Sequence, residues 1–184
     1  PNKGVIIFDN GVDGANGSMD DNIPSLITHC SFDSCNVSIH YFSNVKILNC
    51  DFSNANVSTY WQTPYPGGII LCDNGSPEIG NCRFTKGSIN AGFLFGSRGG
   101  AISCYNSSPL IYNTLIYQNN FTAYDPLGHW ANGAGIICVN NSSPQIINCT
   151  IADNLSTNGI MCYNSNPVLI NTIIWNGIDD CYAW

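Results

Sequence analysis

A phrase that runs from residue 67 to residue 84, GGIILCDNGSPEIGNCRF, returns three times along this chain with small changes. The later copies are GGAISCYNSSPLIYNTLI (99–116), GAGIICVNNSSPQIINCTI (133–151) and NGIMCYNSNPVLINTII (158–174). Copies of one phrase indicate a repeat architecture, in which each copy buries its apolar face only against its neighbours. The repeat therefore constrains the fold more than any other feature of the sequence.

Within each copy, apolar residues alternate with other residues over very short runs, as at Ile70 and Cys72 and again at Cys82 and Phe84. Alternation with period two over such short runs indicates strands. Turn formers such as Asn-Gly-Ser-Pro (74–77) separate the runs, so each copy reads as three short strands joined by sharp turns. Because every copy restarts with the same strand, we expect equivalent strands to stack in parallel, about 4.8 Å apart.

Asparagine and cysteine recur at fixed places in the copies. The asparagines of one turn are Asn10, Asn74, Asn106, Asn140 and Asn164, and those of a second turn are Asn49, Asn81, Asn113, Asn148 and Asn171. One core position holds Cys72, Cys104, Cys138 and Cys162, with Phe8 and Tyr41 expected there near the N-terminus; another holds Cys30, Cys50, Cys82 and Cys149, with Thr114 and Thr172 in two copies. Asparagine tolerates left-handed backbone angles. A position that accepts Cys, Thr or an aromatic residue is a buried packing site, although neighbouring rungs also leave inter-rung disulfides open.

The pattern Gly-Gly-x-Ile-x-Cys…Ser-Pro-x-Ile-x-Asn-Cys-x-Ile resembles the right-handed parallel β-helix repeat family, the pectate-lyase-like superfamily of secreted proteins. The resemblance covers residues 67–174 closely and residues 4–52 more loosely. It implies an all-β fold, a right-handed parallel β-helix solenoid with three short strands per rung, about six rungs and no evident end caps. We expect one domain over 1–184, either a segment of a longer solenoid or a subunit that stacks end to end.

The composition excludes some partners. Only 9% of the residues are charged, the net charge is −7, and five basic residues cannot form a nucleic-acid footprint. No apolar run is long enough to span a membrane, and the resemblance implies a secreted or cell-surface location. Several Asn-x-Ser/Thr sequons are present, which occur by chance in a chain rich in these residues or mark N-glycosylation sites. Asn56, Asn120 and Asn154 are the better glycosylation candidates, because they fall in predicted loops.

Most length variation lies between the third strand of one copy and the first strand of the next, in the segments 53–66, 85–98, 117–132 and 152–157. Loops that leave a coil at the same corner line up along one edge. The aromatic and histidine residues of this edge are Tyr60, Trp61, Tyr65, Phe93, Phe95, Phe121, Tyr124, His129 and Trp130. Clustered aromatic groups suit sugar rings, so this edge is a candidate glycan-binding site. Packing of these aromatic groups onto the coil is the favoured alternative, and a protein–protein contact is another.

A second candidate is the acidic segment 9–22. Its Asp9, Asp13, Asp20 and Asp21 partly follow the spacing of a Ca²⁺-binding loop, although no helices flank it. An acidic surface loop without a metal is the alternative. Apart from Ca²⁺ at this loop, the sequence predicts no cofactor.

Enzymes of the superfamily that the chain resembles provide a third comparison. The Gly-His-Gly and Arg-x-Lys motifs of polygalacturonase-like members are absent. Lyase-like members need a proton acceptor and cations for the uronate carboxylate, for which Lys86, Arg98, Tyr124 and His129 are the candidates. His29 and His40 lie in or beside strands and are expected to be structural.

The sequence therefore predicts a structural or adhesive β-helix scaffold that associates with itself end to end or continues in a longer chain. A polysaccharide lyase that uses the aromatic edge as its cleft is the alternative. A carbohydrate-binding module without catalytic groups is a third reading of the same edge.

Overall fold

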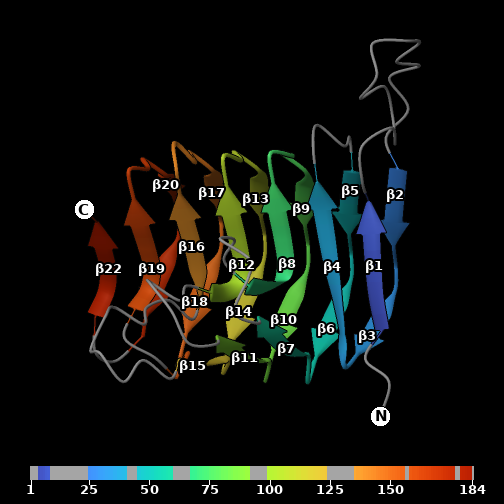
Figure 1. The fold of residues 1–184 in the computed structure, drawn as a ribbon. Coiled ribbons are helices and arrows are strands. Elements are labelled where there is room, and N and C mark those ends of the chain that lie inside the picture. The colour runs from blue at the N-terminus through green and yellow to red at the C-terminus, as the bar shows by residue number, and fades with distance from the viewer. Residues whose placement is uncertain are drawn as a thin grey trace, which may run out of the picture.

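The computed structural model describes residues 4–8, 25–40, 45–59, 67–91, 99–123, 135–155, 158–176 and 179–183. Every regular element in these ranges is a β-strand, and the strands stack along one axis (Figure 1). All pairings between neighbouring strands are parallel, and each strand pairs with its equivalent from the previous and the next rung. The chain is therefore a parallel β-helix, as the repeat predicts.

Three sheets run along the coil and a fourth, shorter sheet accompanies them. Sheet A contains β1 (Gly4–Phe8), β4 (Cys35–His40), β8 (Gly67–Asp73), β12 (Gly99–Tyr105), β16 (Ile136–Val139), β19 (Asn158–Tyr163) and β22 (Asp179–Ala183). Sheet B contains β2 (Ser25–Thr28), β5 (Val45–Leu48), β9 (Glu78–Gly80), β13 (Leu110–Tyr112), β17 (Gln145–Ile147) and β20 (Val168–Ile170). Sheet C contains β3 (Ser31–Asp33), β6 (Asp51–Ser53), β10 (Arg83–Thr85), β14 (Leu115–Tyr117), β18 (Thr150–Ala152) and β21 (Ile173–Trp175). Sheet D contains β7 (Asn56–Thr59), β11 (Ser88–Ala91) and β15 (Asn120–Ala123).

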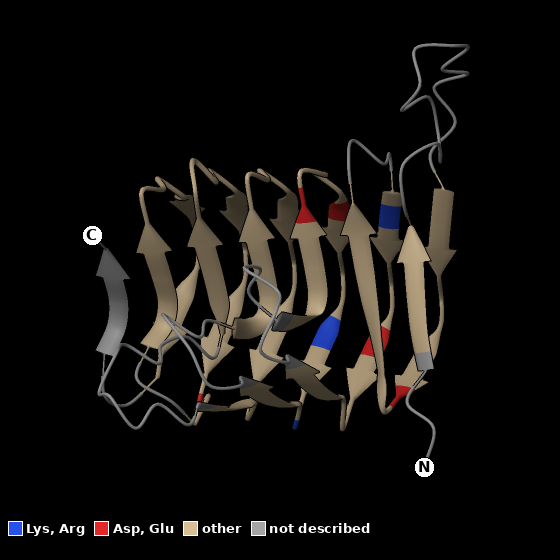
Figure 2. Cartoon of the chain, viewed as in Figure 1, with Lys and Arg blue, Asp and Glu red and all other residues tan. Residues whose placement is uncertain are grey.

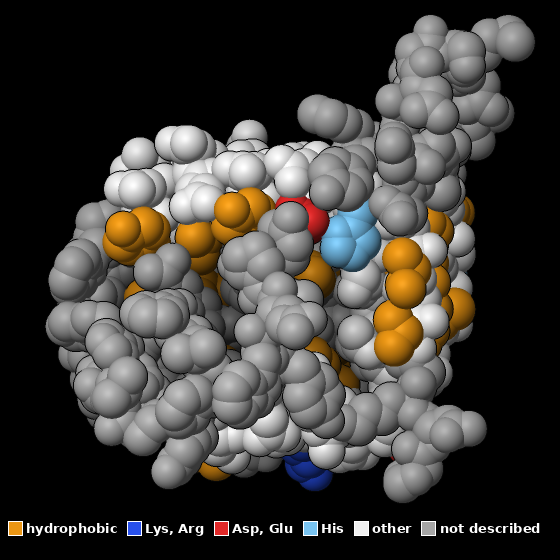
Figure 3. All heavy atoms as spheres, in the orientation of Figure 1, with side chains coloured by type: hydrophobic (Ala, Val, Ile, Leu, Met, Phe, Trp, Pro, Cys, Tyr) orange, Lys and Arg blue, Asp and Glu red, His pale blue; other side chains and the backbone are white. Residues whose placement is uncertain are grey.

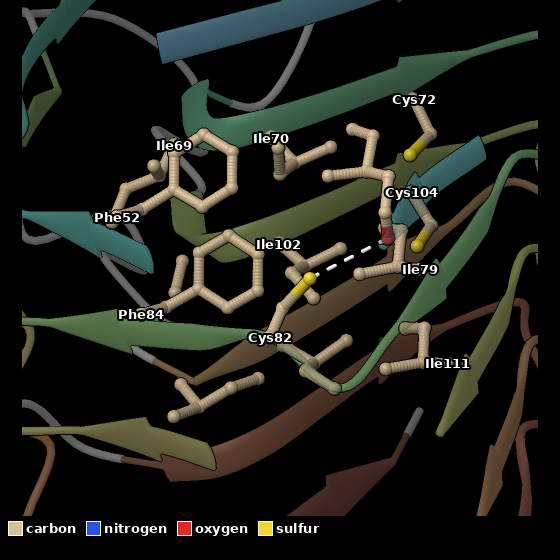
Figure 4. Close-up of a cluster of buried hydrophobic side chains, with 14 of the residues drawn as sticks. Phe52, Ile69, Ile70, Cys72, Ile79, Cys82, Phe84, Ile102, Cys104 and Ile111 are labelled. Atoms are coloured by element: carbon tan, nitrogen blue, oxygen red, sulfur yellow. Dashed lines mark hydrogen bonds between the residues drawn. The ribbon is translucent and has the colours of Figure 1, made fainter. Parts of the chain in front are cut away.

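The core is built from axial columns of identical or similar side chains. Ile79, Ile111 and Ile146 follow one another through sheet B and are fully buried. In sheet C the rings of Phe52 and Phe84 are stacked, with centroids 4.9 Å apart and planes 8° apart (Figure 4). Burying one such side chain contributes about 1.5–3 kcal/mol, so the columns supply most of the apolar stabilisation of each rung.

The turns between sheets depend on left-handed backbone angles. Both predicted asparagine columns are confirmed wherever the structure describes them, since Asn74, Asn106, Asn140 and Asn164 and also Asn49, Asn81, Asn113, Asn148 and Asn171 have positive φ. A third column with positive φ directly follows the strands of sheet C: Ser34, Asn54, Lys86, Gln118 and Asp153. Its members have different side chains, so the sequence did not reveal it.

The predicted loops are shorter than expected, because each of three predicted loops contains a strand of sheet D. β7, β11 and β15 lie inside the segments 53–66, 85–98 and 117–132, and Leu155 forms an isolated parallel bridge with Asn120. The expectation that Phe121 belongs to an exposed aromatic edge is wrong. Its side chain is buried in the main core, because it alternates inward along β15 with Ile89 as its register partner.

The two cysteine positions are confirmed as core columns. Cys72, Cys104, Cys138 and Cys162 are in register, and the cysteines that the structure describes are free thiols. The expectation that Tyr41 precedes Cys72 in this column is wrong, because Ile39 is the register partner of Cys72 and Phe8 that of Ile39. A core-facing Ile39 fits the alternation of β4.

The second column is a hydrogen-bonding position as well as a packing site. Each of its side chains donates to the carbonyl two residues earlier, at 3.2 Å for Cys82 to Gly80 and 2.9 Å for Thr114 to Tyr112. Several also reach a carbonyl of the preceding rung, as Cys82 does with Ile47 at 3.4 Å. A γ-donor is required here, which explains why Thr replaces Cys in this column.

Candidate functional site

Most residues predicted to form a site lie outside the residues that the structure describes. These are the catalytic candidates Arg98, Tyr124 and His129, the ligand-binding candidates Tyr60, Trp61, Tyr65, Phe93, Phe95 and Trp130, and the Ca²⁺ candidates Asp9, Asp13, Asp20 and Asp21. Their roles stay predictions. In the described part of the chain, no three His, Cys, Asp or Glu side chains are grouped so that they could hold a metal ion.

Lys86 is the predicted catalytic residue that the structure describes. It occupies the turn between β10 and β11 with φ of 56°, and its backbone N–H donates to the Tyr117 carbonyl at 3.3 Å. The side chain is exposed and lines a shallow depression of about 550 Å³. The other lining residues are Gln118, Asp153, Asn154, Leu155 and Asn176.

Two of the lining residues, Asn154 and Asn176, belong to a column of buried asparagines that begins at Asn119. The Asn119 side-chain oxygen accepts from the Gly87 N–H at 2.9 Å, and that of Asn154 accepts from the Asn119 N–H at 3.1 Å. Asn176 repeats the contact with the Asn154 N–H at 2.9 Å. Asn154 lies in the loop after β18, as expected, but it is buried, because its amide also donates to the Ile116 carbonyl inside the coil. The expectation that Asn56 and Asn120 are loop residues is wrong, because they begin β7 and β15.

A glycine at the start of this column is required by space. A Cβ on Gly87 would lie 2.5 Å from Ile69 Cδ1 and 2.9 Å from Asn119 Oδ1. Any larger residue would displace the amide that bonds to the Gly87 N–H. Side-chain-to-backbone hydrogen bonds that link successive rungs therefore hold this asparagine column in place beneath the depression.

A second polar site lies on the outer face of sheet A, where β4 and β8 end. His40 Nδ1 and Asp73 Oδ2 are 3.0 Å apart, and Asn74 Nδ2 donates to Asp73 Oδ1 at 2.7 Å. The Asp73 side chain is 1% exposed and the His40 side chain 24% exposed. Figure 3 shows this face, with a histidine beside an acidic group among mostly uncharged side chains. A buried carboxylate that orients an imidazole is an arrangement suited to proton transfer.

Sequence reasoning assigned His40 only a structural role and did not connect it with Asp73. The two residues are far apart in sequence and meet through the register of β4 with β8, in which His40 is the partner of Asp73. Beyond Asp73, the same row of sheet A continues with Tyr105, Val139 and Tyr163. These three side chains belong to a second apolar cluster with Ile137 and Met161.

Cross-rung ion pairs account for other charges on the coil, which carries few of them (Figure 2). Lys46 and Glu78 are register partners with a 2.6 Å contact, and Tyr112 donates to Glu78 at 2.8 Å. Hydrogen bonds from Lys46 and Tyr112 lower the pKa of Glu78. Arg83 and Asp51 form the equivalent pair on sheet C at 2.6 Å.

Two buried thiols of the second cysteine column, those of Cys82 and Cys149, are not activated. Burial raises the pKa of Cys82 to about 11, and burial also raises the pKa of Cys149. Both thiols therefore stay protonated near neutral pH and act as hydrogen-bond donors in the second cysteine column. Their role is structural.

The repeated part of the chain matches a known protein family. The family model described as the right-handed β-helix region matches residues 63–181, well over half of the chain. A search of curated proteins and a search of solved structures each found no match. In the described part of the chain, no helix is long and apolar enough to cross a membrane.

Proposed function

The chain belongs to the right-handed β-helix family, and on that premise we propose that it is an extracellular or cell-surface scaffold with a structural or adhesive role. The observation that supports this proposal is that the side chains recurring from copy to copy contact their equivalents in the neighbouring rungs. Contacts of this kind stabilise the coil along its axis, and a chain whose repeated residues make them is suited to forming a rod.

Four kinds of axial contact support this proposal. On the outer turns, Asn113 Nδ2 donates to Asn81 Oδ1 at 3.0 Å, and Asn148 Nδ2 donates to Asn113 Oδ1 at 3.2 Å. Serines repeat the contact at another turn, where the Ser108 N–H donates to Ser76 Oγ at 2.8 Å. The buried asparagine column and the cysteine–threonine column add contacts inside the coil. Each hydrogen bond contributes about 0.5–1.5 kcal/mol, and every rung has several.

The apolar surface of the last rungs supports association at this end. Leu169 is the register partner of the fully buried Ile146, yet it is 42% exposed. We propose that this surface is covered either by a second copy stacked end to end or by further rungs of a longer chain.

An adhesive role would use the aromatic edge. The residues proposed to contact glycans or partner proteins are Tyr60, Trp61, Tyr65, Phe93, Phe95, Tyr124 and Trp130. The alternative function is that of a polysaccharide lyase, with Lys86, Arg98, Tyr124 and His129 as the catalytic groups. The depression beside Lys86 is the observation that favours this alternative.

One set of experiments separates the two functions. Purified protein is imaged by negative-stain electron microscopy at neutral pH and incubated with a panel of acidic and neutral polysaccharides, with and without Ca²⁺. The scaffold proposal predicts rods or unbranched filaments, glycan binding that Trp61→Ala or Trp130→Ala weakens, and no chain cleavage. Cleavage that is lost in Lys86→Ala or His129→Ala while the far-ultraviolet circular dichroism is kept would establish the enzyme instead.

A further inference from the structure

Two charged side chains stand out among those that the structure describes, because they have neither an ion-pair nor a hydrogen-bond partner. They are Lys86 and Asp153, and both line the depression between sheets C and D. The other carboxylates and cations whose side chains the structure describes have partners, such as Asp33 with Asn54 at 2.7 Å. Among these described side chains, Lys86 and Asp153 therefore carry the charges that have no partner.

The two residues belong to one straight column, in which Gln118 lies between them. Their backbones are fixed in the left-handed region, with φ of 56°, 55° and 51° for Lys86, Gln118 and Asp153. The Lys86 and Gln118 N–H groups donate to the Tyr117 and Ala152 carbonyls, each at 3.3 Å. One rung separates each neighbour, so Lys86 and Asp153 lie about 10 Å apart along the axis at the parallel-strand spacing.

The order of this column is cation, amide, anion at equal intervals, and such an order is complementary to itself. A two-fold rotation about an axis through Gln118, perpendicular to the coil, exchanges the position of Lys86 with that of Asp153. We propose that the column Lys86–Gln118–Asp153 is a side-by-side interface between two antiparallel copies of this chain. Each Lys86 then faces Asp153 of the second copy, and the two Gln118 amides face each other.

Charge selects the antiparallel arrangement. Two parallel copies in register would place Lys86 against Lys86 and Asp153 against Asp153, and like charges in contact are unfavourable. The apolar contact comes from the two residues that flank the anionic end. Leu155 lines the depression and is 67% exposed, and Trp175, one rung beyond Asp153, is 71% exposed. Because the interface is two-fold symmetric, Leu155 and Trp175 of one copy lie at one end of the interface and those of the second copy lie at the other end.

This interface lies on the side of the coil and is independent of stacking at its ends. It goes beyond the scaffold function proposed above, because it pairs rods laterally and fixes their relative direction. Its test is designed so that end-to-end stacking gives a different result.

The test is analytical ultracentrifugation of the full chain and of charge-reversed variants over a range of concentrations and salt. Lys86→Asp and Asp153→Lys are the single reversals, and the double variant carries both. The left-handed turn accepts each substitution, because Lys and Asp already occupy equivalent positions in this column. Gln145→Asp, which adds a charge on the exposed face of sheet B, is the matched control. Circular dichroism verifies that each variant is folded.

The expected result is a dimer whose dissociation constant rises with salt. Each single reversal raises that constant about tenfold or more, because the substitution enters the symmetric interface twice. The double variant regains the wild-type constant to within about threefold, since its order is again self-complementary. A monomer at every concentration overturns the proposal. So does association that both single reversals leave unchanged, and if that association is abolished by Leu169→Lys it belongs to end-to-end stacking instead.

Discussion

Replacing Asn119 by alanine removes one link from the buried asparagine column and measures what the column contributes. The Asn119 side chain accepts from the Gly87 N–H at 2.9 Å, donates to the Phe84 carbonyl at 2.9 Å and donates to Asn154 Oδ1 at 3.1 Å. The side chain is fully buried, so water cannot replace these contacts in the folded state.

The expected loss is larger than that of an ordinary hydrogen bond. Alanine leaves the Gly87 N–H buried without its acceptor, which costs about 1–3 kcal/mol, and each lost hydrogen bond adds about 0.5–1.5 kcal/mol. The free energy of unfolding should therefore fall by about 2–6 kcal/mol. Asn119→Asp keeps an acceptor for Gly87 but sets a carboxylate against the Phe84 and Asn154 oxygens, so we expect it to be at least as harmful at neutral pH.

Urea unfolding followed by circular dichroism measures the change, with Asn90→Ala as the control. Asn90 also joins neighbouring rungs through its side chain, which contacts Asn56 at 3.4 Å and Thr122, but it lies on the outer side of sheet D. Solvent can replace those bonds, so the control should lose less than about 1 kcal/mol. An Asn119→Ala variant that loses no more than this control would refute the assignment of the column as a stabilising element.

Three further predictions follow from individual side chains. Cys82 has a pKa raised by burial from 9.0 to about 11, so its contribution to stability is complete below pH 9 and is lost as the pH rises to about 11. Cys82→Thr keeps the γ-donor but has no thiol to ionise, so urea titrations should show a smaller loss of unfolding free energy between pH 9 and pH 11. The same pH dependence as in the wild type would contradict the assignment to Cys82. His40→Ala leaves the buried Asp73 carboxylate without its imidazole partner and should lower the free energy of unfolding by about 1–3 kcal/mol, measured by the same titration; no loss would mean that the pair does not stabilise the fold. In a glycosylating host, mass spectrometry should find Asn56 more readily modified than Asn154, because Asn154 is buried in the coil; preferential modification of Asn154 would contradict its place there.

The repeat made the fold predictable because a side chain that recurs at the same place in each copy indicates the same backbone angle or the same buried position in each rung. Asn81, Asn113 and Asn148 keep the same left-handed angle, and the same residue type marks it each time. The turn column of Lys86, Gln118 and Asp153 shares that angle without sharing a side chain, and a backbone angle leaves no mark in the sequence when several residue types adopt it. Sheet D was hidden for the same reason, since this turn precedes its strands.

The His40–Asp73 pair shows a different limit, which is register. Aligning Tyr41 with Cys72 would make Leu71 the partner of His40, whereas the register of β4 with β8 makes Asp73 its partner. A shift of two residues keeps every side chain on the same face, so the alternation of apolar and polar residues cannot detect it. The predicted loop residues pose a third limit, because their roles depend on loop conformations that a strand repeat does not encode.

Residues that recur in the sequence stack as axial columns, and distances measured along one column are a direct test of this stacking. Leu26, Leu110 and Val168 are exposed members of a single outward column of sheet B. Spin labels on a genetically encoded ketone amino acid, which spares the native thiols, can be placed there in pairs and measured by pulsed electron paramagnetic resonance. If the columns stack as described, the backbone separations are about 10 Å for 110–168, about 14 Å for 26–110 and about 24 Å for 26–168, in proportion to the number of rungs. Distances that do not grow in proportion to the rung count would contradict the columns and the scaffold built on them.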